Sequence, residues 1–312
     1  MKVKYILTIL VLYACSAGAY AQWDPQFSQY WRVKTYFNPA FAGETSDLQA
    51  TILHRQQWVG ISGAPKTFII AADMPFRFFE RVHGVGLSMM TESIGLFSNK
   101  SLNVQYAYKK QWGKNLLNIG VQAGLHTIGF ASDKIHLTGD GETDDAQPTG
   151  GEDGKAYDFG LGVSWITPDY YAGLSVSHLT EPAVELSENS ETFISRTYYL
   201  TAGYNIRFQN PLYELQPSFL IKSDAVFIQY DITARLVYAK MFNAGISWRK
   251  DDGFIFSLGL KYKSIDAGYA YDLSMSDINV ASSGTHEFFV RLSMPIKLQP
   301  AGKNRQKSVR IL

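Results

Sequence analysis

The stretch VFIQYDITARLVY, residues 226–238, alternates apolar and polar side chains almost throughout. Every second residue from Val226 to Tyr238 is apolar, and the positions between them include Gln229, Asp231, Thr233 and Arg235. A period of two is typical of a β-strand whose two faces meet different surroundings. A strand of this length exceeds the roughly 3–10 residues usual in globular sheets. It suits a tilted strand that crosses a membrane and extends beyond it.

The same period of two recurs along the chain and predicts an all-β protein. It is clearest in residues 117–125, 159–165 and 198–206. Fourteen segments fit a strand: 48–57, 66–74, 84–92, 100–110, 115–128, 156–166, 169–178, 195–208, 211–221, 225–240, 242–249, 253–263, 265–272 and 285–297. An even number of strands is usual in single-chain bacterial barrels. The sequence therefore predicts a transmembrane antiparallel β-barrel of about 14 strands.

A secreted β-sandwich, or a pair of sandwiches, also fits alternation alone. The ends of the apolar stripes favour the barrel, because they carry the aromatic residues of an interfacial girdle. These residues are Tyr106, Tyr108, Trp112, Trp165, Tyr238, Trp248 and Tyr262. The polar face, which includes Asn118, Gln122, Gln229, Asp231 and Arg235, is then expected to line the barrel interior.

The lengths of the connections predict how the barrel is oriented. Gly113-Lys114 and Ser264 form tight turns, which mark the periplasmic side of such barrels. The long connections 129–155, 179–194 and 273–284 each follow an odd-numbered segment, so they share the opposite end. We expect these loops to face outward and both termini to lie on the periplasmic side.

The first 21 residues are interpreted as a secretory signal peptide and excluded from the fold. Two lysines precede the apolar run 5–13, which is too short to span a bilayer, and Ala19-Tyr20-Ala21 fits a cleavage site. A lipoprotein signal ending at Cys15 is the competing interpretation. Cleavage after Ala21 leaves no cysteine, which excludes disulfides, cysteine metal sites and thiol catalysis. The signal predicts a protein that leaves the cytoplasm.

No pattern in the sequence supports catalysis, a cofactor or nucleic-acid binding. The 29 basic residues nearly balance the 28 acidic residues, so no basic excess favours nucleic acid. The acidic loop 129–155 could hold calcium but lacks the spacing of a calcium loop. The six histidines are scattered, so single lumen-facing side chains are the default, and no metal site is predicted. His126 and His178 have no obvious paired serine and acid, which disfavours an acyl hydrolase.

Residues 22–45, here called the N-terminal segment, are rich in aromatic residues and turns without resembling a strand. Asp24-Pro25 and Asn38-Pro39 impose turns, because the residue before proline is kept from the helical region. Phe27, Tyr30 and Trp31 need burial. We expect the segment to act as a plug in the lumen or a docking element, rather than a frayed terminus. The proposed plug or docking residues are Trp23, Asp24, Pro25, Gln26, Phe27, Ser28, Gln29, Tyr30, Asn38, Pro39, Ala40 and Gly43.

These blocks resemble the opening signature of the PorP/SprF membrane proteins of the type IX secretion system. The resemblance continues through residues 55–58, 63–67, 84–87 and 284–287, and it spans Asp24 to about Leu298. It singles out the barrel positions Arg55, Trp58, Pro65, Gly84, Gly86, His286 and Glu287. The chain thus divides into a signal peptide (1–21), the N-terminal segment (22–45), a barrel (46–298) and a basic tail (299–312).

The resemblance implies a non-enzymatic, multi-pass outer-membrane component of type IX secretion in gliding or periodontal Bacteroidetes, supporting motility or virulence. Its implied partners are outer-membrane lipid, a periplasmic ring lipoprotein and a peptidoglycan-associated protein. Cargo with C-terminal sorting domains and gliding adhesins are further candidates. The basic tail 299–312 is either a periplasmic docking strip or a solvated end. The alternative function is a hydrophobic small-molecule transport barrel with a plugged lumen.

Overall fold

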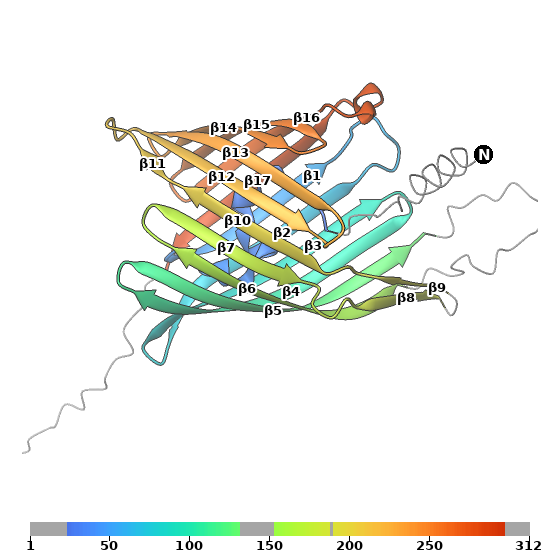
Figure 1. Ribbon diagram of the computed structural model, residues 1–312, viewed down its shortest axis with the longest axis horizontal. Coiled ribbons are helices and arrows are strands. Elements are labelled where there is room, and N and C mark those ends of the chain that lie inside the picture. Colours follow the sequence, from blue (N-terminus) through green and yellow to red (C-terminus); the bar gives the residue numbers. More distant parts are fainter. Residues whose placement is uncertain (1–23, 132–152, 188–189, 297–312) are drawn as a thin grey trace, which may run out of the picture.

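The computed structural model describes residues 24–131, 153–187 and 190–296, which form a closed antiparallel β-barrel (Figure 1). Within these residues the barrel has fourteen strands, and pairing of β1 with β17 closes it. The strands are β1 (Asp47–Gln56), β2 (Lys66–Phe78), β3 (Arg81–Ile94), β4 (Phe97–Trp112), β5 (Asn115–Phe130), β6 (Gly154–Ile166), β7 (Tyr170–Ser177), β10 (Thr197–Tyr204), β12 (Tyr213–Ser223), β13 (Ile228–Tyr238), β14 (Phe242–Arg249), β15 (Gly253–Tyr262), β16 (Ile265–Ser274) and β17 (Thr285–Pro295). The prediction of an all-β barrel is confirmed.

The two faces of each strand explain why the chain closes into a barrel. Apolar side chains point outward, as for Ile232, whose exposed fraction is 54%, while the adjacent Asp231 and Thr233 are buried inside. β5 repeats this pattern, with Val121 exposed and Gln122 buried. A soluble sandwich buries its apolar face instead. An apolar outer surface needs lipid around it, because exposing it to water is costly.

Several element bounds differ from those expected, for local reasons. β13 begins at Ile228, because Asp224 Oδ1 accepts hydrogen bonds from the N–H groups of Val226 and Phe227 and holds them in a turn. The segment 195–208 divides into β10 and the short β11 (Ile206–Arg207). The expected loop 179–194 contains a small hairpin of β8 (Ala183–Ser187) and β9 (Ser190–Phe193).

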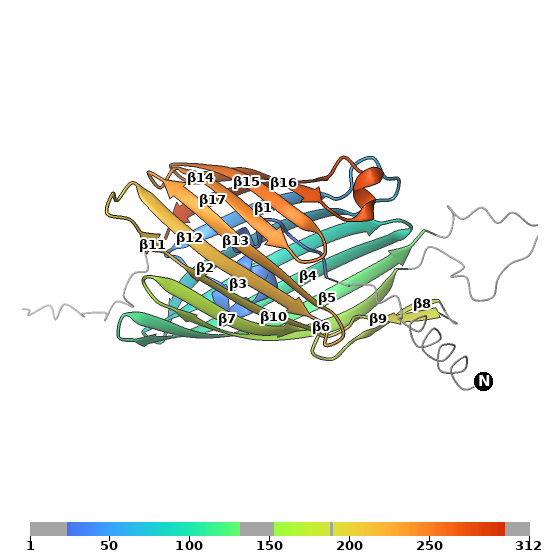
Figure 2. The ribbon, with the colours of Figure 1, turned by 45° about the horizontal axis from the view of Figure 1, so that its top comes forward.

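The connections fall into two groups at opposite ends of the barrel. The long ones, including β8–β9 and the 3-10 helix η4 (Asp277–Val280), lie at what we call the long-loop end (Figure 2). Turns such as 113–114 and 263–264 form the short-turn end. Aromatic pairs mark both ends: Trp112 and Trp165 lie 6.2 Å apart at the short-turn end, and Tyr230 and Trp248 lie 5.6 Å apart toward the long-loop end. This arrangement fits two interfacial girdles.

Three short helical turns precede β1. They are η1 (Tyr30–Arg32), α2 (Lys34–Phe37) and η2 (Pro39–Phe41). None of the helices in the described part of the chain has the length and apolar character to cross a membrane. These turns belong to the N-terminal segment, which the barrel strands surround (Figures 1 and 2).

Replacement of Ile232 by arginine is expected to destabilise the barrel, because its side chain faces outward near the middle of β13. An arginine near the bilayer midplane costs about 2–4 kcal/mol, falling to about 0–1 kcal/mol near the interface. Val226→Arg is the matched control, because Val226 is exposed in the turn before the same strand. Urea unfolding of the refolded barrel in lipid vesicles measures both. Equal losses would show that β13 does not cross the bilayer in this way.

Single cysteines test which end faces outward. Asn279 lies in η4 at the long-loop end and Lys114 in a turn at the short-turn end, and both are exposed. In a background with Cys15 replaced, a membrane-impermeant maleimide on intact cells should label Asn279→Cys and leave Lys114→Cys unlabelled until the cells are lysed. The opposite labelling pattern would reverse the predicted orientation.

Candidate functional site: the N-terminal segment inside the barrel

The N-terminal segment runs through the barrel from one end to the other. Asp24 lies toward the long-loop end, where its carboxylate Oδ1 is 3.1 Å from Nε2 of His178, directly after β7. Near the opposite end the N–H of Gly43 donates to Asp73 Oδ2 at 2.9 Å, shortly before β1 begins. β1 starts and β17 ends at the short-turn end, as expected for both termini. The first described residue nevertheless lies toward the other end, and Trp23 lies outside the described residues.

Asn38 shows how the local sequence shapes the segment. It is extended, with φ −146° and ψ 111°, as expected of a residue before proline. Its Oδ1 accepts from the N–H of Ala40 at 2.9 Å and caps η2. Its Nδ2 donates to the carbonyl oxygens of Val163 (3.1 Å) and Leu174 (3.2 Å) on β6 and β7. One side chain therefore both forms the turn and fixes it to the barrel wall.

The aromatic residues of the segment form the apolar core of the barrel. Phe27 packs edge-on against Tyr36 and Phe37, with ring centroids 5.4 and 5.8 Å apart, and Phe37 lies 5.2 Å from Tyr199 of the wall. Phe27 is only 1% exposed. The wall residues in this core are Leu53, Ile69, Ala71, Met90, Tyr199, Leu220 and Phe289. Side chains of the segment thus supply the partners for the few apolar residues that face the lumen.

Two glycines in the wall allow the segment to approach closely. A Cβ added at Gly84 in β3 would overlap the carbonyl group of Ala42. A Cβ added at Gly120 in β5 would overlap the backbone of Pro39 and Ala40. Glycine is the residue that permits such close approach of two backbones. The Pro39–Ala42 turn is therefore fitted to this part of the wall.

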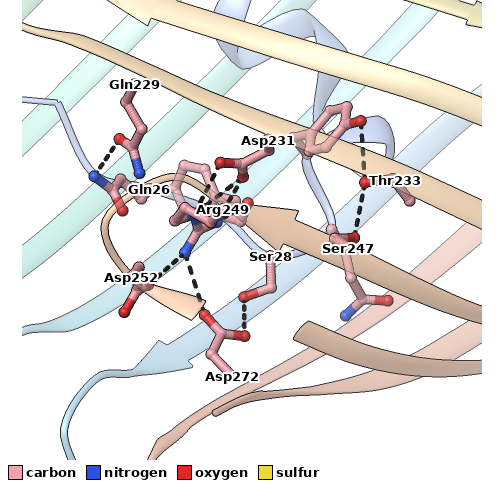
Figure 3. Close-up of polar contacts among 12 residues, drawn as sticks. Gln26, Ser28, Gln229, Asp231, Thr233, Ser247, Arg249, Asp252 and Asp272 are labelled. Carbon is pink, nitrogen blue, oxygen red and sulfur yellow. Dashed lines mark hydrogen bonds and ion pairs between the residues drawn. The ribbon is translucent and has the colours of Figure 1, made fainter. Parts of the chain in front are cut away.

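A buried cluster of charges, here called the arginine cluster, holds the first half of the segment, and Figure 3 shows the part of it around Arg249. It consists of Arg55, Asp231, Arg249, Asp272 and Glu287, which come from five strands. Arg249 makes a forked pair with Asp231, with Nε 3.0 Å from Oδ1 and Nη2 2.8 Å from Oδ2. Arg55 Nη2 lies 2.8 Å from Asp272 Oδ2. The two guanidinium groups thus share the carboxylate of Asp272, which Arg249 Nη1 reaches at 3.3 Å.

The backbone and side chains of the segment complete this cluster. The N–H groups of Ser28 and Gln29 donate to the two oxygens of Glu287 at 2.7 and 2.8 Å. Ser28 Oγ donates to Asp272 Oδ1 at 2.6 Å, and Arg249 Nη2 donates to the carbonyl oxygen of Phe27 at 3.1 Å. Buried charges are costly unless they are paired and hydrogen-bonded. The segment therefore supplies hydrogen bonds that the buried charges require.

Asp24 anchors the beginning of the segment. Its carboxylate accepts a hydrogen bond from Tyr199, and Lys222 Nζ donates to its backbone carbonyl oxygen at 2.7 Å. Burial alone raises the pKa of Asp24, but the neighbouring His178 and Lys222 outweigh burial and hold the carboxyl pKa below its usual range. The carboxylate is therefore ionised at neutral pH, and the anchor is electrostatic.

A polar cavity of about 210 Å³ lies between the second half of the segment and the wall. Arg32 pairs with Asp266, and Lys34 Nζ lies 2.6 Å from Glu44 Oε1. The guanidinium of Arg235 stacks over Trp31, 5.0 Å from its ring centroid. The segment thus leaves room for water beside Trp31, Arg32 and Lys34, whereas residues 39–42 pack directly against another part of the wall.

The structure brings together several residues that the sequence singled out separately. Arg55 and Glu287, near opposite ends of the barrel sequence, meet Ser28 and Gln29 in the arginine cluster. Gly84 and Gly86 face the segment near Ala42. Pro65 is buried, and its carbonyl oxygen accepts a hydrogen bond from the N–H of Gln57. The N–H of Trp58 donates to Thr285 Oγ1 at 3.1 Å. Pro65 and Trp58 thus both shape the connection between β1 and β2.

The expectation of single lumen-facing histidines is wrong for the described residues. His54 is exposed on the outer face, and His286 lies there against Tyr269. His126 and His178 do face inward, but they lie together beside Asp158, an acid that the sequence did not reveal as their neighbour. This grouping of His126, Asp158 and His178 could not be predicted, because the three residues are far apart in the sequence. The carboxylates suggested for calcium lie mostly in 132–152, outside the described residues.

Arg249 is the main residue of the site that the sequence did not single out. The only available signal was an arginine on the inward face of β14, next to the aromatic Trp248. Its partners Asp231 and Asp272 lie on β13 and β16, and only strand register brings them within reach.

Arg249→Met is expected to lower the free energy of unfolding by about 3–5 kcal/mol, because it leaves buried carboxylates unpaired. Arg207→Met is the matched control: Arg207 pairs with Asp169, but its side chain is 62% exposed, so its loss should cost less than about 1 kcal/mol. Urea unfolding followed by the heat-modifiable gel shift compares the two. A loss at Arg249 no larger than at Arg207 would contradict a structural role for the arginine cluster.

Solved structures with a similar fold include membrane channels and transporters. The Ralstonia pickettii toluene transporter TbuX superposes with a TM-score of 0.52 at 11% sequence identity, covering 85% of this chain and 93% of that one. The TodX deltaS2S3 mutant monoaromatic hydrocarbon channel gives 0.51 at 8% identity, covering 83% and 93%. At such low identity the likeness concerns the fold alone. None of the curated proteins matches the chain significantly.

The family comparison is more specific. The model of the family described as "Type IX secretion system membrane protein PorP/SprF" matches residues 19–292, nearly the whole barrel and its N-terminal segment. This match and the fourteen-strand barrel with its apolar outer face identify a multi-pass protein of the outer membrane. Family and fold are those of a secretion or transport membrane protein. The chain belongs to the PorP/SprF family of type IX secretion system membrane proteins.

Proposed function

We propose that this outer-membrane component of type IX secretion works as a closed barrel, with the N-terminal segment as its plug. In this role the chain supports export or surface anchoring of cargo with C-terminal sorting domains, and of adhesins in gliding species. It does so by docking periplasmic partners, namely a ring lipoprotein and a peptidoglycan-associated protein, rather than by conducting the cargo itself. The packing of the N-terminal segment against the lumen wall carries the proposal.

The burial of the segment favours a plug over a docking element. Phe27, Tyr30 and Phe41 are each 1% exposed, so they offer no surface to a partner. Moving the segment aside would remove hydrogen bonds from Asp272 and Glu287 inside the lumen. A buried charge that loses its partner costs several kcal/mol. A polypeptide in transit would have to overcome this cost, which supports a closed barrel.

The same interior argues against the alternative of a hydrophobic-substrate transporter. A transporter of apolar molecules needs a continuous apolar path. Here the lumen carries Arg55, Arg249 and Asp231 toward one end, and Arg32 with Asp266 toward the other. The likeness to hydrocarbon channels extends to the fold of the barrel and supplies no such path. Docking at the barrel rim remains compatible with this interior.

Deletion of residues 24–43 tests the plug. In planar bilayers we expect the full-length barrel to conduct poorly and the deletion variant to conduct several-fold better, with the heat-modifiable folded form still present on gels. Deletion of 299–312 is the control, and it should leave conductance unchanged. A docking element predicts the converse: unchanged conductance after deletion of 24–43, with loss of the periplasmic partners in a pull-down.

Secretion is measured in the same strains. Surface display of a sorting-domain cargo should fail without the chain and recover with the full-length protein. Intact conductance, partner capture and cargo display in the 24–43 deletion would together exclude any role for the segment. Normal cargo display in cells lacking the whole chain would contradict its role in export.

A further inference from the structure

Three inward side chains of neighbouring strands gather toward the long-loop end of the barrel. His126 lies on β5 and Asp158 on β6, on the same face, because the register pairs His126 with Ala156, two residues from Asp158. His178 follows β7 directly, with φ +55°. The side chains are 8%, 0% and 4% exposed, so the group is closed to bulk solvent.

Among the described residues, the polar atoms of this group contact chiefly one another. Nε2 of His126, both carboxylate oxygens of Asp158 and Nδ1 of His178 are buried, and none makes a well-aligned hydrogen bond among the described residues. Two imidazole nitrogens and a carboxylate that converge in a buried site are a donor set that suits a metal ion.

The spacing of these atoms fits a metal ion. Asp158 Oδ2 lies 3.4 Å from His126 Nε2 and 2.9 Å from His178 Nδ1, and one ligand atom from each residue lies within 4.8 Å of the others. Ligands at about 2.0–2.2 Å from a tetrahedral zinc ion are about 3.3–3.6 Å apart. Small adjustments of the three side chains therefore suffice to close the site.

We propose that His126, Asp158 and His178 bind one divalent transition-metal ion of the zinc class. Two imidazole nitrogens and a carboxylate are typical zinc ligands, whereas calcium and magnesium prefer oxygen alone. Three protein ligands leave one position of a tetrahedral ion for a water molecule, and the burial of the side chains closes the site to bulk solvent. The ion links β5 and β6 to the residue that follows β7.

Asp24 gives this site a link to the N-terminal segment. In a metal-binding histidine, the ring nitrogen that does not bind the metal usually donates a hydrogen bond to a carboxylate, and this bond fixes the ring orientation. Here the other nitrogen of His178, Nε2, lies 3.1 Å from Asp24 Oδ1, and Asp24 also accepts from Tyr199. Asp24 is thus a positioning residue for the metal ligand. The ion and the first residue of the described segment are joined through one imidazole ring.

Metal analysis of the full-length protein in detergent tests the proposal. After EDTA treatment and dialysis against Zn²⁺, the wild type should retain about one zinc per chain by mass spectrometry. Zinc affinity, measured by chelator competition, should fall at least tenfold in His126→Gln and Asp158→Asn. Asp24→Asn should weaken it about 10–100-fold, as outer-shell changes do. His83→Gln is the matched control, because His83 is buried against Tyr106 on the outer face.

Zinc K-edge X-ray absorption of the wild type supplies a readout independent of the variants. It should show nitrogen and oxygen neighbours at about 2.0–2.2 Å together with imidazole scattering. The heat-modifiable band reports folding of each variant, so loss of metal is scored only in folded protein. Wild-type protein without stoichiometric zinc, or equal affinity in wild type and folded Asp158→Asn, would overturn the proposal. Neither result would bear on the plug, which conductance tests separately.

Discussion

A guanidinium group inside a membrane barrel must find its counter-charges and hydrogen-bond acceptors within a few ångströms, because neither lipid nor bulk water can supply them. Arg249 meets this requirement with Asp231, Asp272 and the carbonyl oxygen of Phe27. Once Arg249 is fixed, the positions of the surrounding strands and of the N-terminal segment are constrained together. The lumen is therefore organised by charge pairing, and the apolar core fills the space beside it.

The barrel itself could be predicted largely from local pattern. The period of two in residues 117–125 and 226–238 predicts which side chains face lipid. It does so because the apolar or polar character of each residue indicates the face on which it lies. Hydrophobicity alone did not predict where every strand begins, because turns fix some of these bounds. Asp224, for example, holds the following residues in a turn, so that β13 begins only after them. The burial of the N-terminal segment was also foreseeable, since Phe27 and Tyr30 had no strand of their own to join.

The partners of the segment could not be predicted, because they depend on register between distant strands. Ser28 meets Glu287 across 259 positions of sequence, and no local pattern encodes that pairing. The grouping of His126, Asp158 and His178 was hidden for the same reason, although two of the three lie on strands that alternation identified correctly. Short-range signals describe one residue's surroundings, whereas a polar cluster requires several strands to be aligned at once.

The contact of Ser28 and Gln29 with Glu287 also has a consequence for biogenesis. Ser28 and Gln29 precede all the barrel strands and bind a carboxylate on β17, so this part of the core cannot be completed until the last of the described strands is in place. Contacts of such long sequence separation are associated with slow folding, because loop closure must precede them. The same strand, β17, pairs with β1 to close the barrel. Closure of the barrel and binding of the N-terminal segment to Glu287 therefore both wait for β17. A chain that lacks β17 completes neither step and stays accessible to proteases.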